Sequence, residues 1–303
     1  MLQAANAYGL DVAELSLVAE SFNTVFRIVD SANRTFALRV GPELRIHPDG
    51  LENVEAAWLT ELADANVIPV GRVCRNAAGD VLTSVDAPGV SGTRDCVLFD
   101  WVPGQALRHR ATAARVIDAG RMLAVLHEHT ARSGSAKPPP GAMVADQVLY
   151  FCDDRLIDQY SSRFGSLLVE SLARAQRTID GLWANPPHPP HLLHGDYTWD
   201  NLMVESSEIT VIDFQDLVWG FEVQDIVMAL YAFDAADNAD ELCDQFRSGY
   251  ESARAWPADE PQLWDALVAA RRLMQINLSL NLRKPGWSDH IDRLANQLRV
   301  WMA

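Results

Sequence analysis

Two aspartates and an asparagine near residue 200 have the types and spacing that phosphoryl transfer requires. Asp196 ends a His-Gly-Asp segment, and Asn201 follows it after four intervening residues. Asp213 ends the next short β-rich run and directly precedes a phenylalanine. Transfer from ATP needs an oriented hydroxyl and cations that neutralise the triphosphate. A carboxylate can take the hydroxyl proton, and carboxylate and amide oxygens suit Mg²⁺. We therefore predict Asp196 as the catalytic base and Asn201 and Asp213 as magnesium ligands.

The same spacing is typical of protein-kinase catalytic loops, in which a later metal-binding Asp precedes a Phe. The structural alternative is a turn with a helix-capping Asp and a buried His. A neighbouring strand that ends in Asp-Phe favours the kinase interpretation, because a motif is credible only in its structural context. The dipeptide Gly-Lys does not occur, so the sequence has no Walker A loop, and HExxH, GxSxG and GxGxxG are absent too.

The segments that must position these residues begin with a mixed helix and strand pattern. Apolar residues at steps of three and four indicate a helix around residues 51–62, and two β-rich runs around a turn indicate a hairpin. The predicted elements are a helix over Ala4–Leu15, hairpin strands over Thr24–Val29 and Thr35–Val40, the helix over 51–62, and strands near Val70–Cys74 and Asp95–Phe99.

Helical patterns dominate after Pro103-Gly104, apart from a β-rich island at Leu202–Ile212. Domains usually contain about 100–200 residues, so a chain of 303 residues predicts two domains or a large one. We place the boundary at this break, which gives domains 1–102 and 103–303. The predicted helices are Thr112–Thr130, Met143–Phe164, Leu167–Ala184, Asp225–Phe233, Ala239–Ala253 and Gln262–Leu282.

In their order along the chain, several segments resemble the aminoglycoside phosphotransferase/choline kinase superfamily, the small-molecule relatives of protein kinases. The resemblance implies an α+β, protein-kinase-like two-lobed fold with a small β-rich N-lobe and a larger, mainly helical C-lobe. The N-terminal order is also similar to that of homoserine- and hydroxylysine-kinase-type members. The matching segments are YGL, FALRV, VLFDWVPG, AVLHEH, HGDYTWDN, VIDFQD and GFEVQDIVMAL.

The resemblance also implies a nucleotide site for ATP, with GTP as the alternative. Arg39 stands where such kinases carry a basic residue that contacts the phosphates and pairs with a glutamate. Glu52 and Glu55 are the candidate partners, and we favour Glu55. Asn23 lies in the turn that covers the phosphates. The resemblance further implies a hinge segment that would contact adenine, with Phe99, Asp100 and Trp101 as candidate residues. The alternative is that this segment is an ordinary edge strand.

The resemblance places the acceptor among helices of the C-lobe. Trp199 either stacks on the acceptor or packs under the loop, and Asp216 is a candidate for the metal or the acceptor. We expect Asp225 to cap the helix that follows it. Clustered acids would hold a cationic small molecule, such as an aminoglycoside, an amino alcohol or a hydroxy-amino acid, or they are solvated helix faces. These acids are Asp153, Asp154, Glu222, Asp234, Asp237, Asp240 and Glu241.

Composition narrows the classes of partner. With 41 acids against 25 bases the net charge is −16, which repels a nucleic-acid backbone. No stretch reaches the ~18 apolar residues that a membrane span needs, and the N-terminus lacks the pattern of a secretory signal. We therefore expect a cytoplasmic protein with neither nucleic acid nor membrane as a partner. The four cysteines are scattered, which argues against disulfides and structural zinc.

Two other classes of function stay open. The chain could be a protein Ser/Thr kinase of the same superfamily, which would need an open groove for a peptide. It could also be a non-catalytic nucleotide-binding protein. The intact trio Asp196, Asn201 and Asp213 argues against the second.

Overall fold

The structure of the protein is a computed structural model with two compact units. It describes residues 1–20, 22–42, 45–86, 92–132, 137–150, 163–257, 260–282 and 286–303. The first unit comprises Met1–Arg45, Asp49–Arg115 and Trp199–Gln215, and the second comprises Ile46–Pro48, Val116–Thr198 and Asp216–Ala303.

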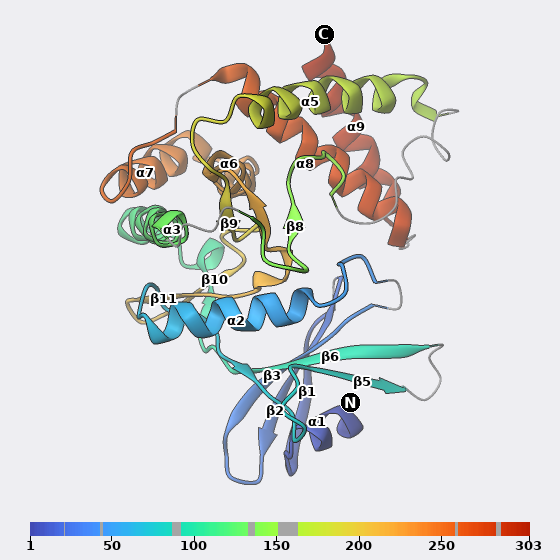
Figure 1. Ribbon diagram of the computed structural model, residues 1–303, viewed down its shortest axis with the longest axis vertical. Helices are drawn as coiled ribbons and strands as arrows, with labels where there is room; N and C mark the ends of the chain where they lie inside the picture. The colour runs from blue at the N-terminus through green and yellow to red at the C-terminus, as the bar shows by residue number, and fades with distance from the viewer. Residues whose placement is uncertain are drawn as a thin grey trace. The chain divides into compact units, whose positions relative to one another are not determined.

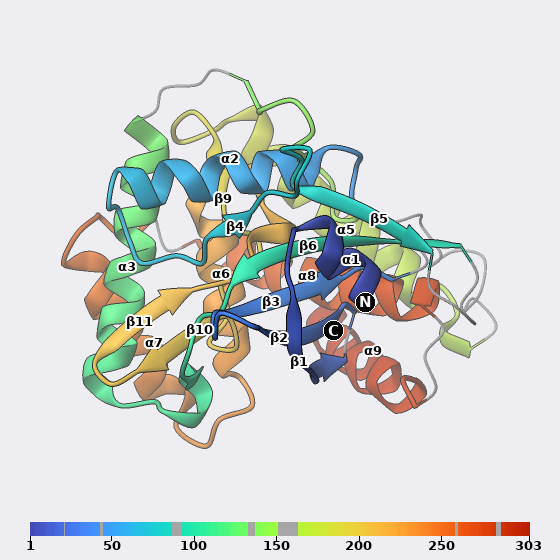
Figure 2. The ribbon, with the colours of Figure 1, turned by 90° about the horizontal axis from the view of Figure 1, so that it is seen from below.

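The first unit is built on an antiparallel sheet of six strands, ordered β1-β2-β3-β6-β4 with β5 also paired to β6. Figure 2 shows β1, β2, β3 and β6 as neighbours. The predicted hairpin is confirmed as β2 and β3, with Asp30 Oδ1 accepting the N–H groups of Ala32 and Arg34 in the turn. The strands are β1 Val12–Glu20, β2 Thr24–Asp30, β3 Thr35–Val40, β4 Val73–Cys74, β5 Leu82–Asp86 and β6 Thr93–Asp100.

Helices α1 (Leu2–Ala7) and α2 (Leu51–Asp64) lie on opposite sides of this sheet (Figure 1). Ala4 and Ala5 of α1 join one apolar cluster with the sheet, and Ala56 of α2 joins another. The predicted helix around residues 51–62 is confirmed. The helix predicted over Ala4–Leu15 is wrong in its second half, because those residues pair with β2 as part of β1.

A second, smaller sheet extends the first unit beyond residue 102. Strand β7 (Gln105–Ala106) pairs with β10 (Leu202–Glu205), which forms a hairpin with β11 (Glu208–Val211). Val70 also bridges to Val211. These pairings place residues 199–215 in the first unit. The sequence predicted two continuous domains instead, 1–102 and 103–303.

The second unit is mainly helical. Helices α5, α8 and α9 pack side by side (Figure 1) around an apolar cluster that includes Ala175, Leu273 and Leu294. Its helices are α3 Ala113–Arg132, α5 Leu167–Ala184, α6 Glu222–Phe233, α7 Ala239–Glu251, α8 Pro261–Leu282 and α9 Ser288–Met302. The first three residues of α3, up to Arg115, belong to the first unit.

A small sheet in the second unit corrects one prediction. The helix predicted over Met143–Phe164 is wrong in residues 143–150, where β8 (Met143–Val144) pairs in parallel with β12 (Val218–Gly220). Strand β9 (His191–Leu193) pairs with the other edge of β12. Residues 151–162 of that predicted helix lie outside the described residues. None of the helices in the described part of the chain is long and apolar enough to cross a membrane.

Candidate active site

In the first unit, the β10–β11 hairpin brings Asn201 and Asp213 together. Leu202 pairs with Val211 as the open end of the hairpin, and the N–H of Ile212 donates to the backbone oxygen of Asn201 at 3.0 Å. Asp213 follows with φ of 63°, a left-handed conformation that is strained for a residue with a Cβ. Its side chain is 35 % exposed. The hairpin therefore holds two hard oxygen donors at one end, and this donor set fits Mg²⁺.

Aromatic packing fixes the chain directly after Asp213. The ring of Phe214 meets that of Trp58 from α2 edge to face, with centroids 5.2 Å apart. Phe214 is fully buried. The Asp-Phe pair thus combines a polar group that faces outward with a neighbouring anchor in the core.

Arg39 on β3 forms a two-pronged ion pair with Glu55 on α2. Arg39 Nη2 lies 2.6 Å from Glu55 Oε2, and Nη1 lies 2.9 Å from Oε1. Nη1 is also 3.3 Å from Asp213 Oδ1, and the guanidinium lies over the Phe99 ring. Burial alone would lower the pKa of Arg39, but the Glu55 carboxylate raises it above its usual value. Arg39 is therefore a fixed cation beside Asp213, and Glu55 rather than Glu52 is its partner.

Glu52 and Asn23 have other contacts. Glu52 accepts from Arg45 at 2.6 Å. Asn23 is 8 % exposed, and its Nδ2 donates to Gln215 Oε1 at 2.7 Å. This bond ties the turn before β2 to the segment after Asp213 within the first unit. Ser21 of the same turn lies outside the described residues.

The hinge predicted to meet adenine is the end of β6 and the residues after it. Phe99 pairs with Ala37 of β3 and is partly buried against the sheet. The N–H of Asp100 donates to Arg72 O at 2.9 Å, and that of Trp101 donates to a backbone oxygen of β3 at 3.1 Å. Both N–H groups are thus used by the sheet, and an adenine role for these residues stays a prediction.

In the second unit, Asp196 lies in a tightly constrained loop. Gly195 has φ of 81°, and a Cβ there would lie 1.9 Å from the backbone oxygen of Asp216, so a larger residue does not fit. Asp196 Oδ1 is 2.6 Å from Nη2 of Arg271 on α8. The Nε of Arg271 is buried and has no hydrogen-bond partner among the described residues. The Nε–H group of Arg271 is therefore a hydrogen-bond donor close to Asp196, the predicted base.

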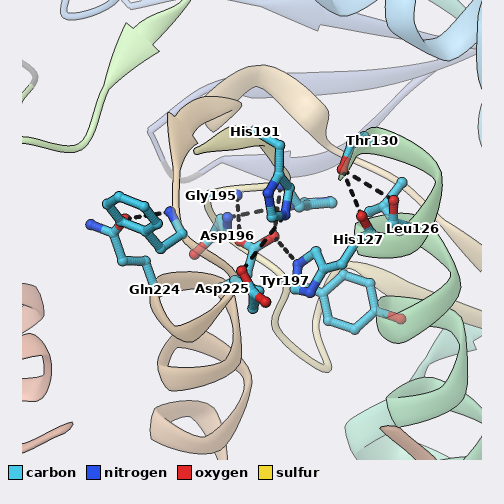
Figure 3. Close-up of polar contacts among 12 residues, drawn as sticks. Leu126, His127, Thr130, His191, Gly195, Asp196, Tyr197, Gln224 and Asp225 are labelled. Atoms are coloured by element: carbon cyan, nitrogen blue, oxygen red, sulfur yellow. Dashed lines mark hydrogen bonds and ion pairs between the residues drawn. The ribbon is translucent and has the colours of Figure 1, made fainter. Parts of the chain in front are cut away.

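Asp225 on α6 holds the backbone of that loop (Figure 3). Its carboxylate accepts the N–H of His194 at 2.8 Å and that of Gly195 at 2.7 Å, and it lies 3.1 Å from His127 Nε2. His127 Nδ1 is 2.9 Å from the hydroxyl of Tyr250. We call Asp225, His127 and Tyr250, with the two backbone N–H groups, the Asp225 cluster. It fixes the backbone that leads directly into Asp196.

The contacts of Asp225 favour its ionised form, and they differ from those of the helix cap that the sequence predicted. Burial alone would raise the pKa of Asp225, but the hydrogen bond and charge of His127 lower it below its ordinary value. The prediction that Asp225 caps α6 is wrong. The N-cap is Phe221, whose N–H donates to Gln224 Oε1 at 2.9 Å. Asp225 instead turns towards the loop before Asp196.

The predicted acceptor residues have different surroundings. Asp216 Oδ1 is 2.7 Å from His47 Nε2, whose hydrogen bond and charge outweigh burial and lower the pKa of Asp216. Trp199 is half-buried in the first unit. Glu222 is buried, with His188 Nε2 2.6 Å from its Oε2 and Arg254 Nη2 3.2 Å from its Oε1. Its carboxylate thus lies between Arg254 on one oxygen and His188 on the other.

The remaining predicted acids divide into two groups. Asp153 and Asp154 lie outside the described residues. The others are exposed at the end of α6 and the start of α7, as expected for solvated helix faces: Asp234, Asp237, Asp240 and Glu241.

Two residues that support the loop before Asp196, Arg271 and His127, were not predicted from the sequence. Arg271 reaches Asp196 from 75 residues away, and its helical context carries no local signal. His127 had a usable signal, because it shares the buried face of α3 with Leu123 and Thr130 at helical spacing.

Comparisons with known proteins identify a family and a fold for this chain. The model of a family described as the phosphotransferase enzyme family matches residues 16–263. No curated protein matches the chain in sequence. Among solved structures, an amicoumacin kinase in complex with AMP-PNP, Ca²⁺ and Ami is similar, with TM-score 0.73, 16 % identity, and coverage of 98 % of this chain and 91 % of that chain.

Two further structures extend the similarity. A microcompartment-associated aminopropanol kinase has TM-score 0.67 and 23 % identity, covering 99 % of this chain and 93 % of that one. A spectinomycin phosphotransferase in complex with ADP and spectinomycin has TM-score 0.61 and 12 % identity, covering 100 % of this chain and 96 % of that one. At these identities the likeness establishes the kinase-like fold.

Proposed function

The chain belongs to the phosphotransferase enzyme family, and we propose that it transfers the γ-phosphoryl group of Mg²⁺-bound ATP to a hydroxyl of a small, amine-bearing molecule. The observation that carries the proposal is the β10–β11 hairpin, which holds Asn201 and Asp213 together beside the Arg39–Glu55 pair. Oxygen donors and a fixed cation at one place are what a nucleoside triphosphate with its metal requires.

Each residue has a distinct task in this reaction. Asn201 and Asp213 would hold the magnesium ion, which neutralises phosphate oxygens when bound. Arg39, held rigid by Glu55, binds phosphate through its planar fork. Asp196 accepts a hydrogen bond from the acceptor hydroxyl, orients its oxygen, and takes the proton onto a carboxylate oxygen as the phosphoryl group moves in line. The Asp225 cluster keeps the backbone of Asp196 in place.

Arg271 favours one of the three acceptor classes. Its guanidinium contacts Asp196 through Nη2 and presents a buried Nε without a partner among the described residues. Buried donors are nearly always paired, so this N–H suits a hydrogen-bond acceptor brought by the substrate. A carboxylate matches guanidinium best. We therefore favour a hydroxy-amino acid over an amino alcohol or an aminoglycoside. The cytoplasmic location stays a prediction.

The test is ADP or GDP release with Mg²⁺, each nucleotide, and a panel of homoserine, hydroxylysine, choline, amino sugars and aminoglycosides. We expect release that depends on one acceptor class and is lost in Asp196→Ala, with ATP affinity nearly unchanged. Phosphate transfer to protein alone would instead indicate a protein Ser/Thr kinase. Nucleotide binding without transfer to any acceptor would indicate a non-catalytic protein.

A matched pair of variants on α8 tests the acceptor class. Arg271→Gln should raise the KM of a carboxylate-bearing acceptor at least about tenfold, because a charge-assisted hydrogen bond is lost. Arg272→Gln is the control, because Arg272 is the next residue of α8. Its Nη2 lies 3.9 Å from Asp234 Oδ2. An equal KM change for acceptors with and without a carboxylate would count against the hydroxy-amino acid while leaving the kinase assignment intact.

A further inference from the structure

A second set of chemically capable side chains gathers in the second unit, at the start of α6. His188 and His191 are separated by two prolines, and His191 begins β9. β9 pairs with β12 so that His191 stands opposite Gly220, and Glu222 follows two residues later as the first residue of α6. The β-pairing therefore brings His191 next to Glu222. Because proline fixes φ, the spacing of the two histidines is restricted. We call these three residues the Glu222 cluster.

His191 is the unusual member of the Glu222 cluster. It is 2 % exposed, and neither ring nitrogen has a hydrogen-bond partner among the described residues. Its Nε2 lies 4.0 Å from Glu222 Oε2, too far for a hydrogen bond. Buried polar groups in proteins are almost always paired, with protein, with water or with an ion. A buried imidazole that is orphaned beside a carboxylate therefore indicates a ligand.

The three side chains converge on one point. One ligand atom from each of His188, His191 and Glu222 lies within 4.8 Å of the others. His188 Nε2 is 2.6 Å from Glu222 Oε2, and His191 Nε2 is 4.0 Å from the same oxygen. Tetrahedral ligands about 2.1 Å from zinc lie roughly 3.4 Å apart, which falls between these two separations.

We propose that His188, His191 and Glu222 form a binding site for a divalent transition-metal ion, with zinc as the expected occupant. Two imidazoles and a carboxylate are a zinc ligand set, whereas Mg²⁺ prefers oxygen ligands alone. The site is thus chemically different from the pair Asn201 and Asp213. His188 is 29 % exposed, which gives a path for the ion and leaves room for a water as fourth ligand.

The neighbours of the Glu222 cluster support this assignment. Arg254 Nη2 lies 3.2 Å from Glu222 Oε1, so one carboxylate oxygen is held while Oε2 faces the histidines. Such outer contacts commonly orient metal ligands. Bound metal would tie the loop of residues 185–190 to the first turn of α6, which also carries Asp225. The ion has a structural role there, holding the helix that positions the loop before Asp196.

The test uses the whole 303-residue chain, without a tag and dialysed against a chelator. Zn²⁺ alone is titrated against a competing chromophoric chelator, with excess Mg²⁺ present to occupy oxygen sites. We expect one zinc per chain and a rise in Tm with zinc, because a ligand of the folded state stabilises it. His191→Asn and Glu222→Gln should each weaken zinc binding about tenfold or more. His290→Asn, in a histidine of α9 outside the cluster, is the matched control and should bind zinc like the unmodified chain.

A measurement on the unmodified chain guards against a variant that fails to fold. Co²⁺ in place of zinc should give visible absorption typical of a tetrahedral nitrogen and oxygen site. A spectrum identical to aqueous Co²⁺, or zinc affinity unchanged in both cluster variants, would overturn the proposal. Loss of the Co²⁺ spectrum in His188→Ala but not in His290→Asn supports it.

Discussion

The first turn of α6 carries two histidine–carboxylate clusters that differ in one respect. In the Asp225 cluster, both carboxylate oxygens and both ring nitrogens of His127 have partners within 3.1 Å. In the Glu222 cluster, His191 is equally buried, yet both of its ring nitrogens lack partners among the described residues. The two clusters touch, since the His127 and His191 rings lie 5.8 Å apart. Composition and burial therefore do not separate them.

Whether the buried polar atoms have hydrogen-bond partners is what separates a structural cluster from a candidate ligand site. A fully paired buried network is rigid and specifies a single arrangement. An orphaned polar group of the same type destabilises the fold unless something binds to it. The Asp225 cluster accordingly has a complete explanation as support for the loop before Asp196. A bound metal ion would explain the Glu222 cluster equally well, because it would give His191 a partner.

Asp225→Asn should have the largest effect. The amide cannot accept two backbone N–H bonds and that of His127 together, so buried donors lose their partners. We expect a loss of about 3 kcal/mol or more in the free energy of unfolding, because several buried donors are left without an acceptor. We also expect kcat to fall about 100-fold or more while the KM for ATP changes little, because the loop before Asp196 shifts. Urea unfolding and initial rates measure both, and an unchanged kcat would contradict the positioning role.

The stability lost in Asp225→Asn should depend on pH. The folded-state pKa of Asp225 lies below its ordinary value, so its ionised form stabilises the fold above the unfolded pKa of about 3.9. This contribution is lost as pH falls through the lower, folded-state pKa. The difference in unfolding free energy between the unmodified chain and Asp225→Asn should therefore be constant at neutral pH and shrink below pH ~4. A difference that grows in acid would contradict the ionised assignment.

Local patterns were enough to predict much of this architecture. The hairpin of β2 and β3, α2, α5 and α8 follow from turn residues and helical spacing, which are properties of short segments. The predicted trio of the site was visible for the same reason, since Asp196, Asn201 and Asp213 lie within one short stretch. Their roles stay predictions, whereas the contact between Arg39 and Glu55 follows directly from the structure.

The errors arise where distant pairing decides the structure. Residues 12–15 have a helix-like pattern but form β1 because β2 pairs with them. Residues 143–144 form β8 because β12, far along the chain, supplies the partner. Arg271 and Asp225 meet the loop of residues 194–196 only through the packing of α8 and α6. No spacing rule in a sequence reports such contacts, although the buried face of α3 did mark His127.

A pair of His→Leu variants, one in each cluster, tests the same difference through a smaller change in stability. In chelator-treated protein, His127→Leu should destabilise the fold by about 2–3 kcal/mol, because Asp225 and Tyr250 lose a buried partner. His191→Leu should be neutral or stabilising by about 1 kcal/mol, since it removes an unpaired buried group. Chemical unfolding of both variants measures this. Equal destabilisation would show that His191 has a partner after all, and the contrast between the clusters would disappear.

The smallest effect is expected for Arg254, which links the Glu222 cluster to α3. Its side chain is 18 % exposed, and it contacts both Glu222 and Glu128. Arg254→Gln should lower the unfolding free energy by about 1 kcal/mol and weaken zinc binding severalfold, because Glu222 loses the contact that orients it. Arg247→Gln is the matched control, since the Arg247–Glu251 pair on α7 is about half exposed and such pairs contribute about 0.5 kcal/mol or less. If both variants bind zinc with the same affinity, Arg254 does not orient the site, and Glu222 must be held by the histidines alone.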